Sequence, residues 1–294
     1  MTSLGLSLVL AAAFCHATWN LFVKRIGGGP ELIWLFSVVA VVLYLPLAAW
    51  ILVVERPALG WVHLGVLAGS SALHMAYFLL LQTGYRNGDL SLVYPTARAS
   101  GPVLSSALAV LVLGETVTPQ LLAGAAVIIA GVLFLTGGGR RAGGGGPRAG
   151  GGGQMSSSLL FGLGAGALIG TYTAWDAHAV AALMVPPLLL DYASSLGRTV
   201  LLAPLAHRRR DRVAALWRDH RWGVVVIAAF NPLAYILVLY ALTFTPVVYV
   251  APVREVSVLL SVLAGSLLLG EGDLARRLGW ALVIFAGLGV LVTA

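Results

Sequence analysis

The stretch LSLVYPTARASGPVLSSALAVLVLGE, residues 90–115, is a long apolar run with an arginine, Arg98, near its middle. A shift of 156 residues lays it on VVYVAPVREVSVLLSVLAGSLLLGE, residues 247–271, and brings Arg98 onto Arg254. The chain is therefore two copies of one unit. Each copy buries an arginine in hydrocarbon-like sequence, which is costly, so these two stretches are the first place to look for function.

The composition is that of a membrane protein. The chain has 294 residues, of which 59% are hydrophobic and 10% are charged, whereas about a quarter of the residues in a soluble domain are charged. Apolar runs dominate where a membrane barrel would show alternation, so we expect an all-α polytopic fold. The net charge of +7 does not indicate a nucleic-acid partner, because most of the arginine sits in short loops.

A helix that spans a membrane needs roughly 20 mostly apolar residues. Ten segments meet this requirement, although prolines and charges interrupt the seventh. They cover residues 4–23, 31–54, 61–84, 90–113, 119–136, 159–180, 185–206, 222–243, 246–269 and 277–293. We therefore predict ten transmembrane helices.

A glycine-rich segment, GGGRRAGGGGPRAGGGG at residues 137–153, separates five predicted helices from five. We expect the first repeat over residues 1–136, a linker over 137–158 and the second repeat over 159–294. Because each repeat has an odd number of helices, the two repeats lie upside down relative to each other, which is the inverted-repeat plan of many transporters. Two fused halves already supply a pseudo-dimer, so we expect a monomer.

Positive charge is unevenly distributed among the nine predicted loops. The odd-numbered loops hold 14 of the 18 lysines and arginines, and the even-numbered loops hold Arg56 alone. Cytoplasmic loops carry the excess of positive charge in membrane proteins. We therefore expect the odd loops in the cytoplasm, both termini outside, and membrane lipid as a partner.

Charged and titratable residues within the predicted spans are the candidates for chemistry. An isolated charge at the bilayer centre costs about 3 kcal/mol or more, depending on the scale. Arginines and acids occur in equal number, so internal pairing is feasible. The residues are Arg98, Arg198, Arg254, Asp176, Asp191, Glu255, His16, His74 and His178.

The fourth predicted helix carries Tyr94, Arg98 and Pro102 along one face. Pro95 and Pro102 are expected to interrupt its hydrogen-bond ladder and to free backbone groups toward a cavity. Two interpretations of Arg98 stay open. It binds an anionic group through a forked contact, or it is a structural arginine tied to backbone carbonyl groups.

The ninth predicted helix repeats this pattern with one change, because Arg254 is followed by Glu255 and preceded by Pro252. Adjacent residues point about 100° apart on a helix, so Arg254 and Glu255 are expected to have different partners. Glu255 is a candidate carrier of a coupling proton, since a buried carboxylic acid can titrate near neutral pH. A fixed ion pair with another helix is the equally open alternative.

The first and sixth predicted helices carry matched polar faces. His16 and Asn20 lie one turn apart with Trp19 beside them, and the shift of 156 maps this face onto Tyr172, Trp175 and Asp176. Matched faces of inverted halves should converge, so we expect them to form the walls of a central site. His16 is a candidate proton relay, with a hydrogen-bonded packing role as the alternative.

Two further helices contribute polar faces. The third helix offers His74 with Tyr77 close by, and the eighth offers Asn231 and Tyr235 around another expected proline break at Pro232. On the seventh helix, Asp191 and Arg198 are interpreted instead as a structural pair bridged by serines.

Other features have structural interpretations. Glycines 162, 166 and 170 form a stripe that suits close helix packing. Glu115 and Glu271 follow glycine at the ends of their helices and are interpreted as turn and capping residues. The sequence contains no phosphate-binding loop, no HExxH motif and no paired-cysteine metal pattern, so we expect no enzyme activity, cofactor or metal.

The chain resembles the EamA-type transporters of the drug/metabolite transporter superfamily. The resemblance rests on the ten helices in two halves, with Gly-Glu at residues 114–115 and 270–271. HATWNLFVKR at residues 16–25, GDLSLVYP at 88–95 and REVSV at 254–258 are similar to signatures of one branch of that family.

The resemblance implies an inner-membrane exporter or importer of small polar metabolites, such as amino acids or other carboxylates. It further implies a central cavity lined by the first, third, fourth, sixth, eighth and ninth helices. In an inner membrane, the outside termini expected from the loop charges are periplasmic. The residues that we expect to bind substrate are His16, Trp19, Asn20, His74, Tyr77, Tyr94, Arg98, Tyr172, Trp175, Asp176, Asn231, Tyr235, Arg254 and Glu255.

We therefore predict a secondary transporter that works by alternating access. No nucleotide motif is present, so a gradient must supply the energy, and a coupling proton is a candidate partner beside the small-molecule substrate. Two other classes stay open, namely an intramembrane enzyme acting on lipid head groups and a membrane scaffold or sensor without transport.

Overall fold

The computed structural model describes residues 1–27, 29–87, 90–137, 152–269 and 274–293. Within these ranges the chain is helical and forms no strand. The elements are α1 (Ser3–Ile26), α2 (Pro30–Trp50), the π-helix η1 (Ile51–Glu55), α3 (Trp61–Asn87), α4 (Leu90–Leu113), α5 (Pro119–Gly137), α6 (Gly152–Ala181), α7 (Pro187–Arg208), α8 (Arg210–Leu242), α9 (Val247–Arg254), α10 (Val256–Leu269) and α11 (Leu274–Val292).

Each apolar segment predicted from the sequence has a helix at its place, and the ninth segment is divided between α9 and α10. Among the described residues, six helices are long and apolar enough to cross a membrane. They are Ser3–Ile26, Pro30–Glu55, Trp61–Leu81, Thr96–Leu113, Ser157–Ala181 and Arg210–Leu242. Shorter apolar runs occupy Pro119–Phe134 and Leu278–Val292. The chain is therefore a helical protein of the multi-pass membrane class.

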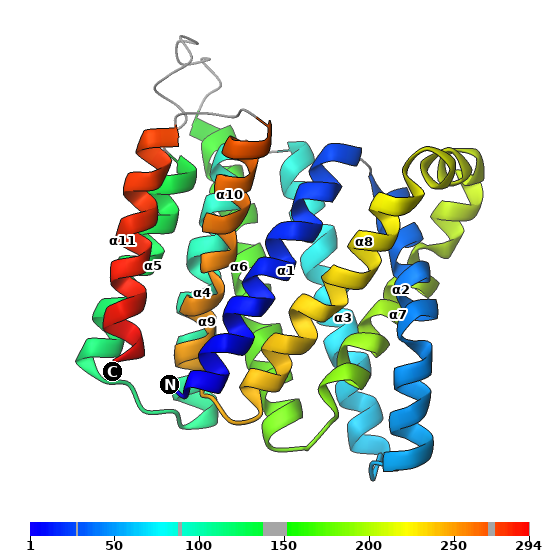
Figure 1. Cartoon of the computed structure of the whole chain (residues 1–294), viewed down its shortest axis with the longest axis horizontal. Coiled ribbons are helices and arrows are strands. Elements are labelled where there is room, and N and C mark those ends of the chain that lie inside the picture. Colours follow the sequence, from blue (N-terminus) through cyan, green and yellow to red (C-terminus); the bar gives the residue numbers. More distant parts are fainter. Residues whose placement is uncertain (28, 88–89, 138–151, 270–273, 294) are drawn as a thin grey trace.

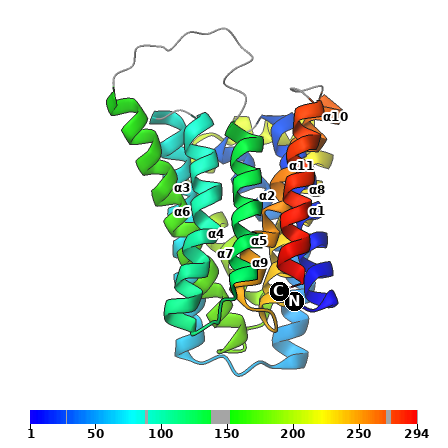
Figure 2. The same ribbon diagram turned by 90° about the vertical axis from the view of Figure 1, so that its left-hand side faces the viewer.

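The two copies of the repeat run in opposite directions through the bundle. α1 begins at the end where both chain termini lie, whereas α6 begins at the opposite end (Figures 1 and 2). The last turn of α1, with Lys24 and Arg25, and the first part of α8, with several arginines, lie at the end away from the termini (Figure 1). This arrangement agrees with the inverted repeat that five helices per copy require.

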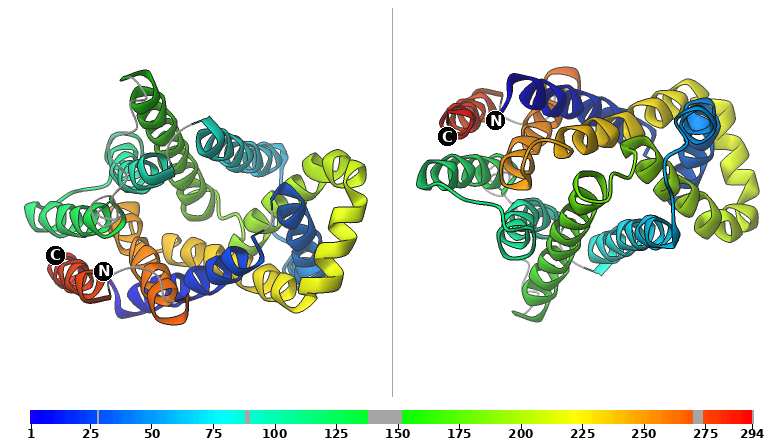
Figure 3. Two further views of the ribbon diagram at one scale, coloured as in Figure 1. Left: turned by 90° about the horizontal axis from the view of Figure 1, so that it is seen from above. Right: turned by 90° about the horizontal axis from the view of Figure 1, so that it is seen from below.

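The two halves are not separate bodies, because helices of each half pack against helices of the other. α6 of the second copy packs on α3 and α4 of the first, and α1 of the first copy packs in the same way on α8 and α10 of the second. α5 and α11 lie side by side at one edge of the bundle, and α2 and α7 at the opposite edge (Figure 3). Each half therefore supplies walls for the space between them.

The glycine stripe on α6 explains how closely α4 approaches. A Cβ atom added at Gly162 would lie 2.6 Å from Cβ of Thr96, and one added at Gly170 would lie 2.8 Å from Cβ of Leu104. These distances leave no space for a methyl group. The packing role predicted for the stripe is therefore confirmed, and it fixes the depth at which Arg98 enters the bundle.

The predicted seventh and eighth helices end at residue 206 and begin at residue 222, which predicts a loop between them. That prediction is wrong from Arg210 onward, because the chain is helical there. α8 begins there and is kinked at His220, where the backbone is not helical. Before the kink the helix runs across the end of the bundle (Figures 1 and 3). Arg209 ties this region down, because its Nη1 donates to Oε1 of the buried Glu31 at 2.7 Å.

Replacing Gly170 by alanine should destabilise the fold. The new methyl group would meet the side chain of Leu104 and the backbone nitrogen of Ser105, at 2.8 Å and 2.9 Å. Overpacking of this kind costs about 1–3 kcal/mol. Denaturant unfolding of the purified protein in detergent measures the loss. Gly65→Ala is the matched control, because apart from its own helix backbone no described atom lies within 4 Å of its added Cβ. Equal stability of the two variants would contradict the packing argument.

Candidate functional site

A cavity of about 360 Å³ lies between the two halves of the bundle. Helices of both copies line it, and many of the lining side chains are polar or aromatic. They include His16, Trp19, Asn20, Phe36, His74, Tyr77, Phe78, Arg98, Tyr172, Asp191, Arg198, Asn231, Tyr235, Arg254 and Ser257. The structure thus brings ten of the residues predicted from the sequence to one space.

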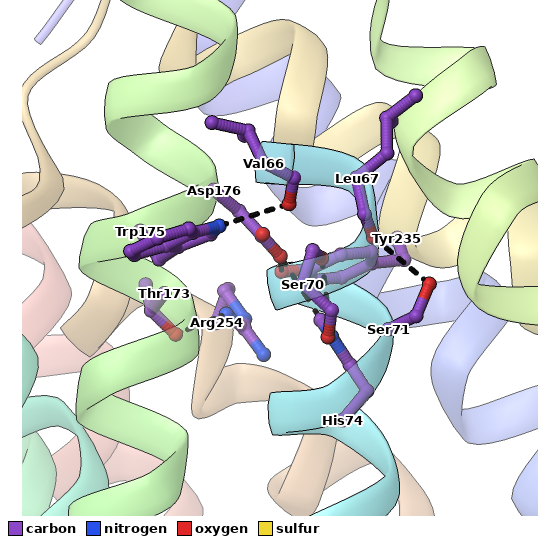
Figure 4. Close-up of polar contacts among 10 residues, drawn as sticks. All are labelled: Val66, Leu67, Ser70, Ser71, His74, Thr173, Trp175, Asp176, Tyr235 and Arg254. Carbon is purple, nitrogen blue, oxygen red and sulfur yellow. Dashed lines mark hydrogen bonds and ion pairs between the residues drawn. The ribbon is translucent and has the colours of Figure 1, made fainter. Parts of the chain in front are cut away.

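Three other predicted residues do not line the cavity, and the side chain of a fourth is not described. Trp175 is 41% exposed and donates from Nε1 to the carbonyl oxygen of Val66 at 3.1 Å, away from the cavity (Figure 4). Asp176 and Glu255 are buried behind the cavity wall. The side chain of Tyr94 is outside the part of the chain that the structure describes.

The helix break predicted for the ninth segment is confirmed, whereas the breaks predicted for the fourth and eighth are wrong. α9 ends at Arg254 and α10 begins after Glu255, so the break places these two residues at mid-bundle. α4 continues through both Pro95 and Pro102, and α6 packs along it. α8 continues through Pro232, where the Tyr44 hydroxyl donates to the nearby Ala229 carbonyl at 2.6 Å.

Arg98 and Glu255 form a buried ion pair between the halves. Nη2 of Arg98 lies 3.2 Å from Oε2 of Glu255 and donates to Oγ of Ser257 at 3.3 Å. Both residues are buried. Of the two interpretations of Glu255 that the sequence left open, the geometry matches the ion pair with another helix. Arg98 lines the cavity, but a carboxylate already faces its guanidinium group.

Arg254 has a different environment. Its Nη1 lies 3.5 Å from Oγ1 of Thr173, and its guanidinium carbon lies 5.8 Å from the ring centre of Tyr235. Among the described residues, no carboxylate oxygen lies within 4 Å of it. The expectation that Arg254 and Glu255 have different partners is confirmed. Arg254 is therefore a cavity cation whose forked donors are open to a ligand.

His74, Asp176 and Tyr235 form a polar cluster beside Arg254 (Figure 4). The Tyr235 hydroxyl donates to Oδ2 of Asp176 at 2.5 Å, and Nε2 of His74 lies 3.8 Å from the same oxygen. The His74 ring stacks on Tyr172 with the ring centres 4.2 Å apart. The fully buried Asp176 thus connects α6 to α3 and α8.

The polar face of α1 reaches the cavity as expected. The indole Nε1 of Trp19 donates to Nδ1 of His16 at 3.2 Å, with the rings edge to face. His16, Trp19 and Asn20 line the cavity together with Tyr172, the residue that the repeat matches to His16. The two matched faces converge as predicted, although Asp176 is set back from the surface.

Asp191 and Arg198 were interpreted as structural, yet both line the cavity. Nη2 of Arg198 donates to Oγ of Ser195 at 2.9 Å, and Oγ of Ser195 lies 3.5 Å from Oδ2 of Asp191. The bridge through a serine is therefore present, while the cavity-facing position was missed. Their mid-span charges within an interrupted apolar run were the signal that could have revealed it.

Glu115 caps a helix of the other half. Its carboxylate accepts from the backbone nitrogen atoms of Val247 and Val248 at 2.8 Å and 3.0 Å, at the start of α9. A carboxylate at a helix N-terminus satisfies free N–H groups. Glu115 is therefore a capping residue, but the helix that it caps is α9, and not its own helix as the sequence had predicted. Its repeat partner Glu271 lies outside the described residues.

Comparisons with known proteins agree with this architecture. A model of the EamA-like transporter family matches residues 3–137 and again residues 156–293. A solved crystal structure with no stated function superposes with a TM-score of 0.73 at 16% identity, over 99% of this chain and 96% of its own. That likeness shows a shared fold. No curated protein matches the sequence.

Breaking the Arg98–Glu255 pair should destabilise the protein strongly. Glu255→Gln leaves the guanidinium group of Arg98 buried without its carboxylate, and loss of one partner of a buried pair costs about 3–5 kcal/mol. A double-mutant cycle with Arg98→Gln, followed by denaturant unfolding in detergent, measures the coupling. The double variant should lose clearly less stability than the sum of the single losses; additive losses would show that the two residues do not interact.

Proposed function

The chain belongs to the EamA-like transporter family, and we propose that it is a secondary transporter that moves a small anionic or zwitterionic metabolite across the inner membrane. An amino acid or another small carboxylate is the solute class that the cavity favours. Members of this family are membrane transporters. The solute class and the transport mechanism are proposed from the cavity and from the arrangement of the two halves.

The main support for this proposal is that Arg254 lines the cavity without a close carboxylate among the described residues. It lines the cavity, it contacts Thr173 and the Tyr235 ring, and no described carboxylate oxygen lies within 4 Å of it. A guanidinium group binds a carboxylate through two parallel N–H···O contacts. A solute carboxylate would thus supply the counter-charge that Glu255 supplies to Arg98.

The size and walls of the cavity support a small solute with both polar and apolar parts. A volume of about 360 Å³ is within the range of small-molecule sites. Trp19, Tyr77 and Tyr172 offer aromatic surfaces, and Asn20 and Asn231 offer amide groups. Such walls can hold an apolar side chain while amides orient the polar end.

The inverted halves support alternating access. α2 begins at the end of the bundle opposite the termini (Figure 1), and its lining residues Ile33 and Phe36 lie in its first two turns. The cavity therefore extends toward the positively charged end. At the other end, Glu115 ties α9 to the first half. Opening to the opposite side requires this tie and its neighbours to separate.

We place ten spans in the membrane, with the positively charged loops in the cytoplasm and both termini in the periplasm. This orientation follows from the loop charges and would make the described state open to the cytoplasm. A gradient drives the cycle, with a proton as the candidate coupling ion and one chain as the transporting unit.

Transport should depend on Arg254. Purified protein in liposomes should take up at least one member of a panel of labelled phenylalanine, benzoate, succinate and glucose, with the charged solutes favoured over glucose. Arg254→Ala removes the charged donors, so it should lower the flux about 10- to 100-fold, as expected for a loss of 1.5–3 kcal/mol. Arg254→Lys should also impair flux because a single ammonium group cannot make the forked contact.

The matched control is Arg218→Ala, which removes an exposed arginine outside the cavity. This variant should transport as the wild type does. Equal flux through wild type and Arg254→Ala would contradict the proposed site, and the absence of protein-dependent flux for every charged solute would contradict the proposed substrate class.

A further inference from the structure

The backbone of α3 holds His74 in one tautomer. Nδ1 of His74 lies 2.9 Å from the carbonyl oxygen of Ser70, one turn earlier. A carbonyl oxygen can only accept, so Nδ1 carries the proton of this hydrogen bond. Neutral His74 therefore presents a bare Nε2, and this atom lies 3.8 Å from Oδ2 of Asp176. When both groups are unprotonated, Nε2 of His74 and Oδ2 of Asp176 can each only accept a proton, so neither can donate to the other.

Asp176 is a buried carboxylate without a close arginine or lysine among the described residues. It is fully buried, and no arginine or lysine nitrogen of those residues lies within 4 Å of it. Oδ2 accepts from Tyr235, whereas Oδ1 accepts no hydrogen bond of normal geometry, although the Ser70 hydroxyl lies close to the carboxyl group. An ionised carboxylate in such a place costs several kcal/mol, and a bound proton removes that cost.

The other two acids near the cavity each have an arginine as a direct or a bridged partner. Glu255 lies 3.2 Å from Arg98, and Asp191 is connected to Arg198 through Ser195. These contacts account for two of the three arginines and two of the three acids. Arg254 and Asp176 remain, and both contact the same aromatic residue, Tyr235, through its ring and its hydroxyl group (Figure 4).

We propose that Asp176 is a proton-binding site, that His74 passes the proton to it from the cavity, and that this proton binds together with the anionic solute at Arg254. The inference rests on the transport function proposed above and names its coupling ion and the residues that hold it. It assigns the titrating role to Asp176 and not to Glu255, which the sequence offered as one candidate carrier of the proton.

Every helix packed around Asp176 contributes to its charge environment. α3 contributes His74, α8 contributes Tyr235, and α9 contributes Arg254, which acts on the carboxyl group over a longer range. On α6 itself Tyr172 stacks on His74. More distant charges are those of Asp191 and Arg198 on α7 and of Arg98 on α4, which faces Glu255.

The route for the proton follows from exposure. His74 lines the cavity, whereas Asp176 has no exposed surface. A proton from the cavity reaches Nε2 of His74 and moves from there to the Asp176 carboxylate. His74 then returns to its neutral form, with Nδ1 still bonded to the Ser70 carbonyl. The stacked ring of Tyr172 can stabilise the transient imidazolium ion.

Competition for Arg254 links the proton to the solute. When Asp176 is ionised, its negative charge opposes a second anion near Arg254. When Asp176 is protonated, the solute carboxylate becomes the counter-ion of Arg254. By thermodynamic reciprocity, solute binding must then favour proton binding by the same factor. Solute and proton therefore move in the same direction.

Infrared titration tests the proton site without any solute. In nanodiscs, between roughly pH 5 and pH 8 where histidine titrates, wild type should show the carbonyl band of a protonated carboxylic acid at the acidic end. Asp176→Asn should lack this band, and Asp191→Asn should keep it. Tyr235→Phe should shift its frequency, because the hydrogen bond to Oδ2 is lost. No such band in wild type, or its survival in Asp176→Asn, would overturn the proposal.

Flux measurements test the coupling, with the panel anion of greatest Arg254-dependent flux as the probe. An acidic exterior should raise its uptake into wild-type liposomes about fivefold or more, the lower end of common coupling strengths. Asp176→Asn should exchange the anion without responding to the gradient, whereas Asp219→Asn, an exposed control, should respond as wild type does.

The outcomes separate the two proposals. Flux that depends on Arg254 but responds to pH equally in Asp176→Asn would overturn the coupling and leave the transport function intact. If no member of the panel is transported, the proposed function fails, and the infrared titration still decides whether Asp176 binds a proton.

Discussion

The ion pair between Arg98 and Glu255 joins the two halves of the protein inside an apolar bundle. Each charge alone would be very costly at this depth, and each is supplied by a different copy of the repeat. The pair therefore requires α4 to lie against the break between α9 and α10. The glycine stripe of α6 allows α4 to approach closely enough for this contact, and the cavity lies in the space that remains.

The two copies use their shared arginine differently. Arg98 is followed by Ala99, whereas Arg254 is followed by Glu255. The added carboxylate points to the first copy and neutralises Arg98, so Arg254 keeps no described carboxylate within 4 Å. One substitution between the repeats thus turns a symmetric pair of buried cations into one structural arginine and one arginine that is open to a ligand.

Much of the fold could be predicted from the sequence, because the shift that lays Arg98 on Arg254 also fixes the repeat, the inversion and the convergence of the matched faces. The failures were local. Proline positions alone predicted breaks in three helices, but α4 stays whole at Pro95 and Pro102, and α8 stays whole at Pro232. Tertiary contacts decide this: α6 packs along α4, and the Tyr44 hydroxyl bonds to the backbone of α8 near the proline.

The site was predictable in its residue types and less so in its pairings. Helical periodicity placed His16, Tyr172 and Arg254 on inward faces, and they line the cavity. It also placed Trp175 on an inward face. This residue lies three positions after Tyr172, and its side chain turns toward α3 instead. Which acid meets which arginine depends on the depth of each helix in the bundle, and periodicity along one helix contains no information on that depth.

The central claim is that Arg254 holds the negatively charged group of the solute. An experimental structure of the protein with a bound transported anion tests it most directly. The account predicts that the carboxylate of the anion lies within hydrogen-bond distance of the Arg254 guanidinium group, with Arg98 still paired to Glu255. A carboxylate bound at Arg98 with that pair separated, or a solute that contacts neither arginine, would contradict it.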